Sequence, residues 1–224
     1  DPYTSSTLYS EDGPTMGYCQ YLIDVWLTGQ DRVRKEIDLR KLSAEDRKAF
    51  DKSMLNEWNN WELFDAVDAV DPSQVPDHAQ IVPTRWVHTD KNAAARAGGR
   101  KLPLFAKSRI VVLGFLEKSW LRSDSPTASL LAFSLVCSLA ASNKWELVAG
   151  DAPNAYLQGD PLQRLLVLRP PRPLPKPELE GKLLIAKNGI NGTRDGGRAF
   201  WTKLRRLILE SGFTAHPLEP ALFV

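Results

Sequence analysis

The pattern of apolar and polar positions predicts an amphipathic helix that begins after Ser43. Ser43 is a favourable N-cap, and Glu45 and Asp46 behind it suit the positive end of a helix dipole. Apolar side chains then recur every three or four residues, which is the spacing of one helical face. That face comprises Phe50, Met54, Leu55, Trp58 and Trp61. A stripe of this kind is typical of a helix that packs on a core rather than of a ligand-binding surface.

Short runs rich in β-branched and aromatic residues predict strands further along the chain. These strands are expected over residues 83–92, 107–115, 145–149, 164–169 and 182–187. Residues 93–100 contain Gly98 and Gly99 and are predicted to form a mobile tip between the first two strands. Residues 65–83 contain three prolines and are predicted to be a connector.

Two further helices are predicted in the second half of the chain. Ser125 and Pro126 form a strong helix start, with serine as the cap and proline at the first helical position. Because residues 128–141 are apolar on nearly every side, we expect this helix to be buried. The last helix is predicted to begin at Gly197 and to stop at Gly212.

Composition places the chain among ordinary globular proteins. Of the 224 residues, 43% are hydrophobic and 25% are charged, and the net charge is only +2. The charge is unevenly distributed, because residues 1–70 carry 14 acidic and 8 basic side chains, and the remainder carries 13 acidic and 21 basic ones. A basic C-terminal two-thirds favours a polyanionic partner, although a surplus of this size also occurs on plain globular domains.

Cysteine usage and hydropathy indicate where in the cell the protein is expected. The two cysteines, Cys19 and Cys137, are too few for a disulfide framework and are typical of reduced thiols in an intracellular protein. No apolar run reaches the ~18 residues that a membrane span needs, so no membrane partner is expected. Residues 1–42 form a predicted N-terminal arm without a recognisable motif, and its role cannot be read from the sequence.

Asp151 is the first candidate for chemistry. It follows the predicted strand over residues 145–149, and Pro153 and Asn154 prevent that strand from continuing. A carboxylate at the exit of a strand is rigidly held and accessible to a cation, which suits a metal ligand. The alternative is a simple turn residue, because aspartate before Ala-Pro-Asn favours turns.

Lys107 and Arg109 are the second candidates. Residues two apart in a strand point to the same face, so both side chains could meet one triphosphate. The segment from Arg96 to Arg122 contains seven basic residues and one acidic residue. The alternative is an edge strand whose charges prevent pairing with other chains.

The third candidates lie in the loop before the last predicted helix, where Arg194 and Arg198 surround a glycine pair. Glycines before a helix allow close approach of a nucleic-acid template, and basic side chains can meet its phosphates. The alternative is a flexible loop that is capped by Asp195.

Taken in order, these stretches resemble the copia-type (Ty1/copia) retrotransposon reverse transcriptases. The stretch 145–160, Trp-Glu-Leu-x-x-x-Asp-x-x-x-Ala-Tyr-Leu-x-Gly-Asp, is similar to the first carboxylate motif of that family. Lys107-Ser-Arg109-Ile-Val-Val-Leu-Gly resembles its fingers strand, and residues 190–201 resemble its Leu-Tyr-Gly-Leu-Lys-Gln-Ala-Pro-Arg-Ala-Trp motif. The C-terminal Glu-Pro-Ala-Leu-Phe-Val resembles the family's Asp-Pro-x-Leu-Phe-Val.

The resemblance implies a fold and a set of roles. It implies an α+β fold for residues 43–224, comprising the fingers and part of the palm of a right-hand polymerase, with a mixed sheet backed by helices. Asp151, with the Ala152 carbonyl, would be the catalytic metal-binding group, and the complete domain would hold two Mg²⁺ or Mn²⁺ ions. Tyr156 would lie under the sugar of the incoming nucleotide, and Lys107 and Arg109 would contact that nucleotide.

The resemblance also implies partners and a location. Arg194 and Arg198 would contact nucleic acid, and the partners would be dNTPs and an RNA or DNA primer–template. The protein would be intracellular, in a cytoplasmic particle or in the nucleus. The sequence gives no indication of oligomeric state.

Two departures from the family pattern affect the functional prediction. The lysine that the family carries before the fingers glycine is Leu113 here, and no Asp-Asp pair occurs anywhere in the chain. The family's Tyr/Phe-x-Asp-Asp hairpin follows the Leu-Phe-Val segment, so we expect an incomplete active site and no polymerisation by this chain alone. The alternatives are a non-catalytic nucleic-acid-binding remnant of a retroelement and an unrelated α+β interaction domain.

Overall fold

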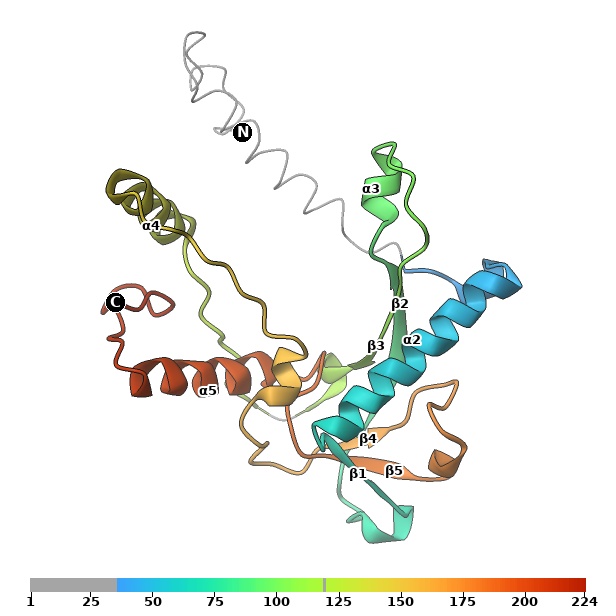
Figure 1. The fold of residues 1–224 in the computed structure, drawn as a ribbon. Coiled ribbons are helices and arrows are strands. Elements are labelled where there is room, and N and C mark those ends of the chain that lie inside the picture. The colour runs from blue at the N-terminus through green and yellow to red at the C-terminus, as the bar shows by residue number, and fades with distance from the viewer. Residues whose placement is uncertain (1–35, 119) are drawn as a thin grey trace, which may run out of the picture.

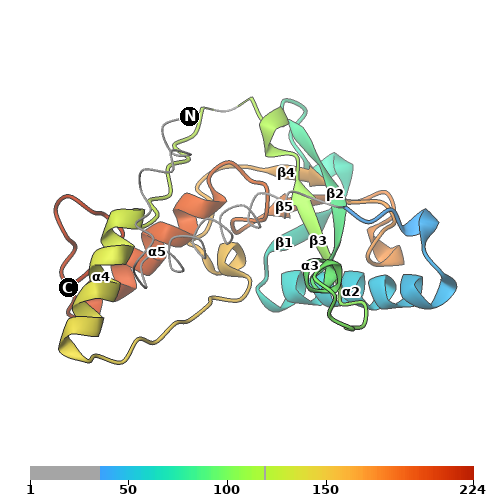
Figure 2. The same cartoon turned by 90° about the horizontal axis from the view of Figure 1, so that it is seen from above.

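The computed structural model describes residues 36–118 and 120–224 (Figures 1 and 2). Most of the predicted N-terminal arm therefore lies outside the described residues. The described part contains four α-helices and one five-stranded sheet, which confirms the predicted α+β fold with a mixed sheet. Short 3₁₀ turns occur at η2 (Leu39–Lys41), η3 (Pro72–Gln74), η4 (Gly114–Leu116), η5 (Ala155–Gln158) and η6 (Pro177–Leu179).

The sheet has the strand order β1-β5-β4-β2-β3. Its strands are β1 (Val67–Val70), β2 (Ile81–Asp90), β3 (Ala106–Val112), β4 (Val167–Arg169) and β5 (Leu183–Ala186). The central pair, β2 with β4, is parallel, and the other three pairs are antiparallel. Segments that are distant in the sequence therefore meet in the middle of the sheet.

Helix α2 (Ala44–Leu63) packs against the sheet and confirms the first helix prediction. The Ser43 hydroxyl accepts a hydrogen bond from the Asp46 backbone N–H at 3.1 Å, as expected of an N-cap. Phe50, Trp58 and Trp61 are buried, and the last two join the core formed with the sheet. Leu55 is 47% exposed, so its predicted place on the buried face is wrong.

The predicted strand over residues 145–149 is wrong. Residues 145–150 have no regular structure and are exposed. A strand needs a neighbour for its backbone hydrogen bonds, and no described strand pairs with this segment. The apolar run is therefore an extended lead-in to Asp151 rather than part of the sheet.

The helix expected to begin at Ser125 begins later. Helix α4 spans Leu130–Asn143, and Ser129 is its N-cap, with the hydroxyl accepting a hydrogen bond from Ala132 N at 3.1 Å. Burial was predicted from its apolar composition, but Leu131 is 79% exposed and Phe133 57% exposed. This exposure follows from the position of α4, which lies away from the sheet (Figure 1).

Two elements were missed in segments predicted to be irregular. The connector over residues 65–83 contains β1, and the tip over residues 93–100 contains helix α3 (Ala93–Ala97). The last helix is confirmed as α5 (Gly196–Glu210), which is followed by Gly212 with a positive φ of 94°. No helix in the described part is long and apolar enough to cross a membrane.

Candidate functional site

A cavity of about 290 Å³ lies between β3 and the turn η5, and we call it the β3–η5 cavity. Its lining combines α2, the turn after β2, β3, the segment around η5 and the loop before α5. Five of the seven site residues predicted from the sequence line it: Lys107, Arg109, Asp151, Ala152 and Tyr156. Glu57, Lys91 and Asn191 also line this cavity.

The turn η5 presents Tyr156 to the cavity, and the segment just before η5 presents Asp151. Asn154, the N-cap residue of η5, has a left-handed backbone with a φ of 54°, and the Leu157 side chain is buried in the core. The Asn188 side-chain amide donates to the Leu157 carbonyl at 3.2 Å and to the Phe64 carbonyl at 3.1 Å. This amide therefore anchors η5 to the end of α2.

Asp151 is accessible to a cation. It is exposed, and its carboxylate makes no hydrogen bond or ion pair with any other residue that the structure describes. The neighbouring Ala152 carbonyl is a second hard oxygen on the same segment. However, within residues 36–118 and 120–224 no group of three or more His, Cys, Asp or Glu residues could hold a metal ion. Asp151 and the Ala152 carbonyl therefore fit as metal ligands on one side, but they do not form a complete site for two ions.

Strand β3 supplies the cationic wall of the cavity. Lys107 is partly buried and Arg109 is exposed, whereas Ser108 between them is fully buried. The Ser108 backbone N–H donates to the Ser53 hydroxyl on α2 at 2.7 Å, and Ser108 Oγ lies 3.0 Å from His88 Nδ1. These contacts fix β3 so that Lys107 and Arg109 both line the cavity, as the two-residue spacing predicted.

Glu57 is a cavity residue that the sequence reasoning missed. Its side chain is only 4% exposed, and Oε2 lies 3.8 Å from Lys107 Nζ. Glu57 Oε1 accepts a hydrogen bond from the Ile110 backbone N–H at 3.3 Å. Burial raises the pKa of the Glu57 carboxyl, and the Lys107 charge opposes that rise. The sequence shows only that Glu57 falls on the apolar face of α2, between Met54 and Trp61, and this becomes informative once its partner Lys107 is known.

The two remaining predicted residues, Arg194 and Arg198, do not line the cavity. Arg194 Nη1 donates to the Glu117 carbonyl at 3.3 Å. Arg198 Nη1 lies 2.7 Å from Asp124 Oδ2, and its guanidinium lies 5.9 Å from the centre of the Trp201 ring. Both arginines are therefore engaged in contacts within the chain.

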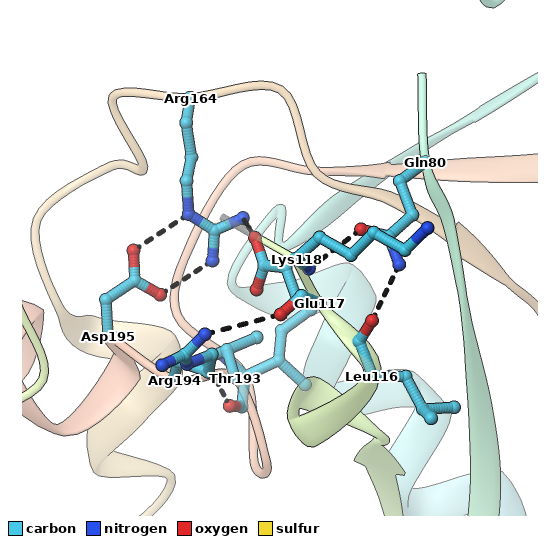
Figure 3. A network of polar contacts seen from close by, with 9 residues as sticks. Gln80, Leu116, Glu117, Lys118, Arg164, Thr193, Arg194 and Asp195 are labelled. Carbon is cyan, nitrogen blue, oxygen red and sulfur yellow. Dashed lines mark hydrogen bonds and ion pairs between the residues drawn. The ribbon is translucent and has the colours of Figure 1, made fainter. Parts of the chain in front are cut away.

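Beside these arginines, Arg164 forms a buried ionic network with Asp195 and Glu117 (Figure 3). Arg164 Nε and Nη2 donate to the two Asp195 oxygens at 3.0 and 2.8 Å, and Nη1 lies 2.7 Å from Glu117 Oε1. The three side chains are 15%, 19% and 6% exposed. Asp195 is the N-cap residue of α5, as in the alternative interpretation of this loop, but its side chain makes no capping hydrogen bond to the start of the helix.

The loop before α5 is also held against the end of β3. The Val112 backbone N–H donates to the Asn191 carbonyl at 2.8 Å. A Cβ on Gly192, which has a φ of 89°, would lie 2.1 Å from the Val112 carbonyl oxygen. Glycine is needed here because two backbone segments pass close together, and this contact places Asn191 at the edge of the β3–η5 cavity.

Comparison with known proteins identifies the class. A family model described as reverse transcriptase (RNA-dependent DNA polymerase) matches residues 67–224. The chain belongs to this reverse transcriptase family, and the resemblance read from its motifs is confirmed.

Curated relatives narrow the comparison to retrotransposons. The chain is similar to the retrovirus-related Pol polyproteins from transposons RE1 and RE2 of Arabidopsis thaliana, with 28% identity over 154 residues and 27% over 152. Each alignment covers 66% of this chain but only 10% of the relative, so the chain corresponds to a small part of those polyproteins. No solved structure gave a significant match.

Proposed function

We propose that this chain is the nucleotide-contacting portion, fingers and part of the palm, of the RNA-directed DNA polymerase of a copia-type retrotransposon. The observation that carries the proposal is the β3–η5 cavity. It combines two cations of β3 with a carboxylate and an aromatic ring near η5. These groups suit three parts of a metal-bound dNTP: the cations suit its triphosphate, the carboxylate suits the metal ion, and the ring suits the sugar.

Each group has a distinct role in the proposed complex. Lys107 and Arg109 bind the triphosphate by charge-assisted hydrogen bonds, which are roughly twice as strong as neutral ones. Tyr156, which is 38% exposed in η5, presents its ring to the sugar and excludes a 2′-hydroxyl. Residues 43–224 form the fingers and part of the palm of the polymerase domain, and the other partner of that domain is an RNA or DNA primer–template inside the cell.

Divalent metal ions complete this proposal. In the complete domain, two bound Mg²⁺ or Mn²⁺ ions would supply the charge stabilisation that phosphoryl transfer needs. Asp151 and the Ala152 carbonyl would hold them from one side. Among the described residues there is no group of three or more His, Cys, Asp or Glu side chains that could hold a metal ion, so the proposal assigns only this one side of the metal site. The same observation favours a second candidate function, a non-catalytic nucleic-acid-binding remnant of a retroelement.

Replacement of both Lys107 and Arg109 by alanine tests the proposed cavity. We expect the affinity for a dNTP and for primer–template to fall by roughly 10²- to 10⁴-fold, because two charge-assisted contacts are lost and each is worth roughly 1.5–3 kcal/mol. The slope of log affinity against log salt should also flatten by about one for each lost phosphate contact. Fluorescence anisotropy over several salt concentrations measures both quantities.

A control variant with the same change in charge is Arg172→Ala/Lys182→Ala. These cations pair with Glu180 and Asp71, and neither residue lines the β3–η5 cavity. The control should retain the affinity of the parent. Equal affinity of the parent and of the Lys107/Arg109 variant at every salt concentration would refute the phosphate-binding role.

Substitution of Tyr156 by alanine tests the sugar contact in a longer version of the chain that polymerises. We expect discrimination against ribonucleotides to fall roughly 10- to 100-fold, because removal of the ring removes the steric clash with the 2′-hydroxyl. Tyr156→Phe retains the ring and should retain discrimination. Single-nucleotide incorporation assays with matched dNTP and rNTP measure the ratio, and an unchanged ratio in Tyr156→Ala would exclude this role.

A further inference from the structure

Glu57 is a buried acid that faces a cavity with several cations. A buried carboxylate is costly unless it is paired and hydrogen-bonded. Glu57 meets this requirement through the Lys107 ammonium at 3.8 Å and the Ile110 backbone N–H at 3.3 Å. Both contacts come from β3, so the carboxylate lies between helix α2 and the cationic wall of the cavity.

The charges that line the β3–η5 cavity are nearly balanced. Lys91, Lys107 and Arg109 contribute positive charge, and Glu57 and Asp151 contribute negative charge. Asp151 lies on the segment beside η5, whereas Glu57 is paired directly with one of the cations proposed to bind phosphate. A polyphosphate that enters the cavity must therefore compete with Glu57 for Lys107.

We propose that Glu57 is the counter-ion of Lys107 in the empty cavity, and that it sets a limit on how tightly the cavity binds a polyphosphate. This inference rests on the proposed phosphate-binding role of Lys107 and Arg109. Glu57 is a positioning residue: it holds the Lys107 ammonium at the cavity wall and weakens its attraction for an entering anion. Weaker binding of phosphate by Lys107 favours release of the pyrophosphate product after each nucleotide addition.

The sign of the effect follows from Coulomb's law. Removal of the Glu57 charge makes the cavity more positive by one unit, so anion binding becomes tighter. A purely structural role predicts the opposite, because loss of a buried contact between α2 and β3 would loosen the cationic wall. Glu57→Gln separates the two possibilities, since glutamine has the same shape and its side-chain oxygen can still accept from Ile110 N–H.

Trimetaphosphate is a suitable probe because it carries three negative charges and has no sugar or base. Its affinity is measured by isothermal titration calorimetry on the full chain without metal ions. We expect Glu57→Gln to bind the probe about five- to tenfold more tightly than the parent. Glu57→Asp retains the charge and should stay within about twofold of the parent, although it disturbs packing more than glutamine does.

Two further variants connect the effect to Lys107 and to the proposed function. The gain from Glu57→Gln should shrink by at least half in a Lys107→Ala background, and circular dichroism verifies that each variant folds. If Lys107→Ala/Arg109→Ala binds the probe as tightly as the parent, or if no variant binds it, the proposed function and this inference both fail. If that double variant loses binding but Glu57→Gln does not tighten it, the inference alone is overturned. The inference is also overturned if Glu57→Gln tightens probe binding as much in the Lys107→Ala background as in the parent.

Discussion

Replacement of Arg164 by alanine is expected to lower the free energy of unfolding by about 3–5 kcal/mol, the cost of removing one partner from a buried ionic network. The guanidinium satisfies both Asp195 oxygens and also pairs with Glu117, and all three side chains are largely buried. Without Arg164, two carboxylates remain in a region with little water. Denaturant unfolding followed by circular dichroism measures the loss.

The matched control for this variant is Arg172→Ala. Arg172 makes a similar two-pronged contact with Glu180 at 2.7 and 2.8 Å, but its side chain is 67% exposed and that of Glu180 is 64% exposed. Exposed pairs contribute roughly 0–1 kcal/mol because water and salt screen them. Similar losses in the two variants would contradict the importance assigned to the buried network.

Replacement of Asp151 by asparagine is expected to reduce primer extension by about 10³-fold or more in a longer version that polymerises. An amide has no charge to offer a divalent cation, and charge stabilisation at the metal is worth several kcal/mol. We expect no primer extension from the 224-residue chain itself, because Asp151 and the Ala152 carbonyl offer too few oxygen ligands for two Mg²⁺ ions. Primer-extension assays with Mg²⁺ and with Mn²⁺ measure both expectations.

Asp160→Asn is the control for the Asp151 variant. Asp160 belongs to the same sequence motif, but its carboxylate pairs with Arg206 of α5 at 2.9 Å. Extension should therefore survive this change, and primer–template binding should survive both changes. Extension by the 224-residue chain that disappears in Asp151→Asn would show that the site is complete within this chain and would overturn the proposal.

Elements with strong local signals could be predicted from the sequence. The Ser43 cap and the apolar stripe defined α2, and alternation around Lys107 and Arg109 defined β3. β1 was missed because its four residues, Val-Asp-Ala-Val, form a strand only through pairing with β5. The strand prediction for the apolar run before Asp151 failed for the opposite reason, because the run has strand composition but no described partner strand.

The candidate site shows the same division between local and long-range information. Spacing placed Lys107 with Arg109, the family resemblance placed Asp151 with Tyr156, and the structure adds that the two pairs line one cavity. Glu57 was missed because an acid within an apolar stripe is informative only when its partner on β3 is known. The Arg164–Asp195 pair was missed because its members are 31 residues apart and each alone is typical of a solvated surface.

The parallel pairing of β2 with β4 affects the chain during its synthesis. The β2–β3 hairpin can form once residue 112 has left the ribosome, but β4 follows only at residues 167–169. At synthesis rates of about 5–20 residues per second, the edge of β2 that pairs with β4 remains unpaired for some seconds. An open strand edge is a template for pairing with other chains. A nascent chain that stalls or is cut between β3 and β4 is therefore expected to be the form most prone to aggregation.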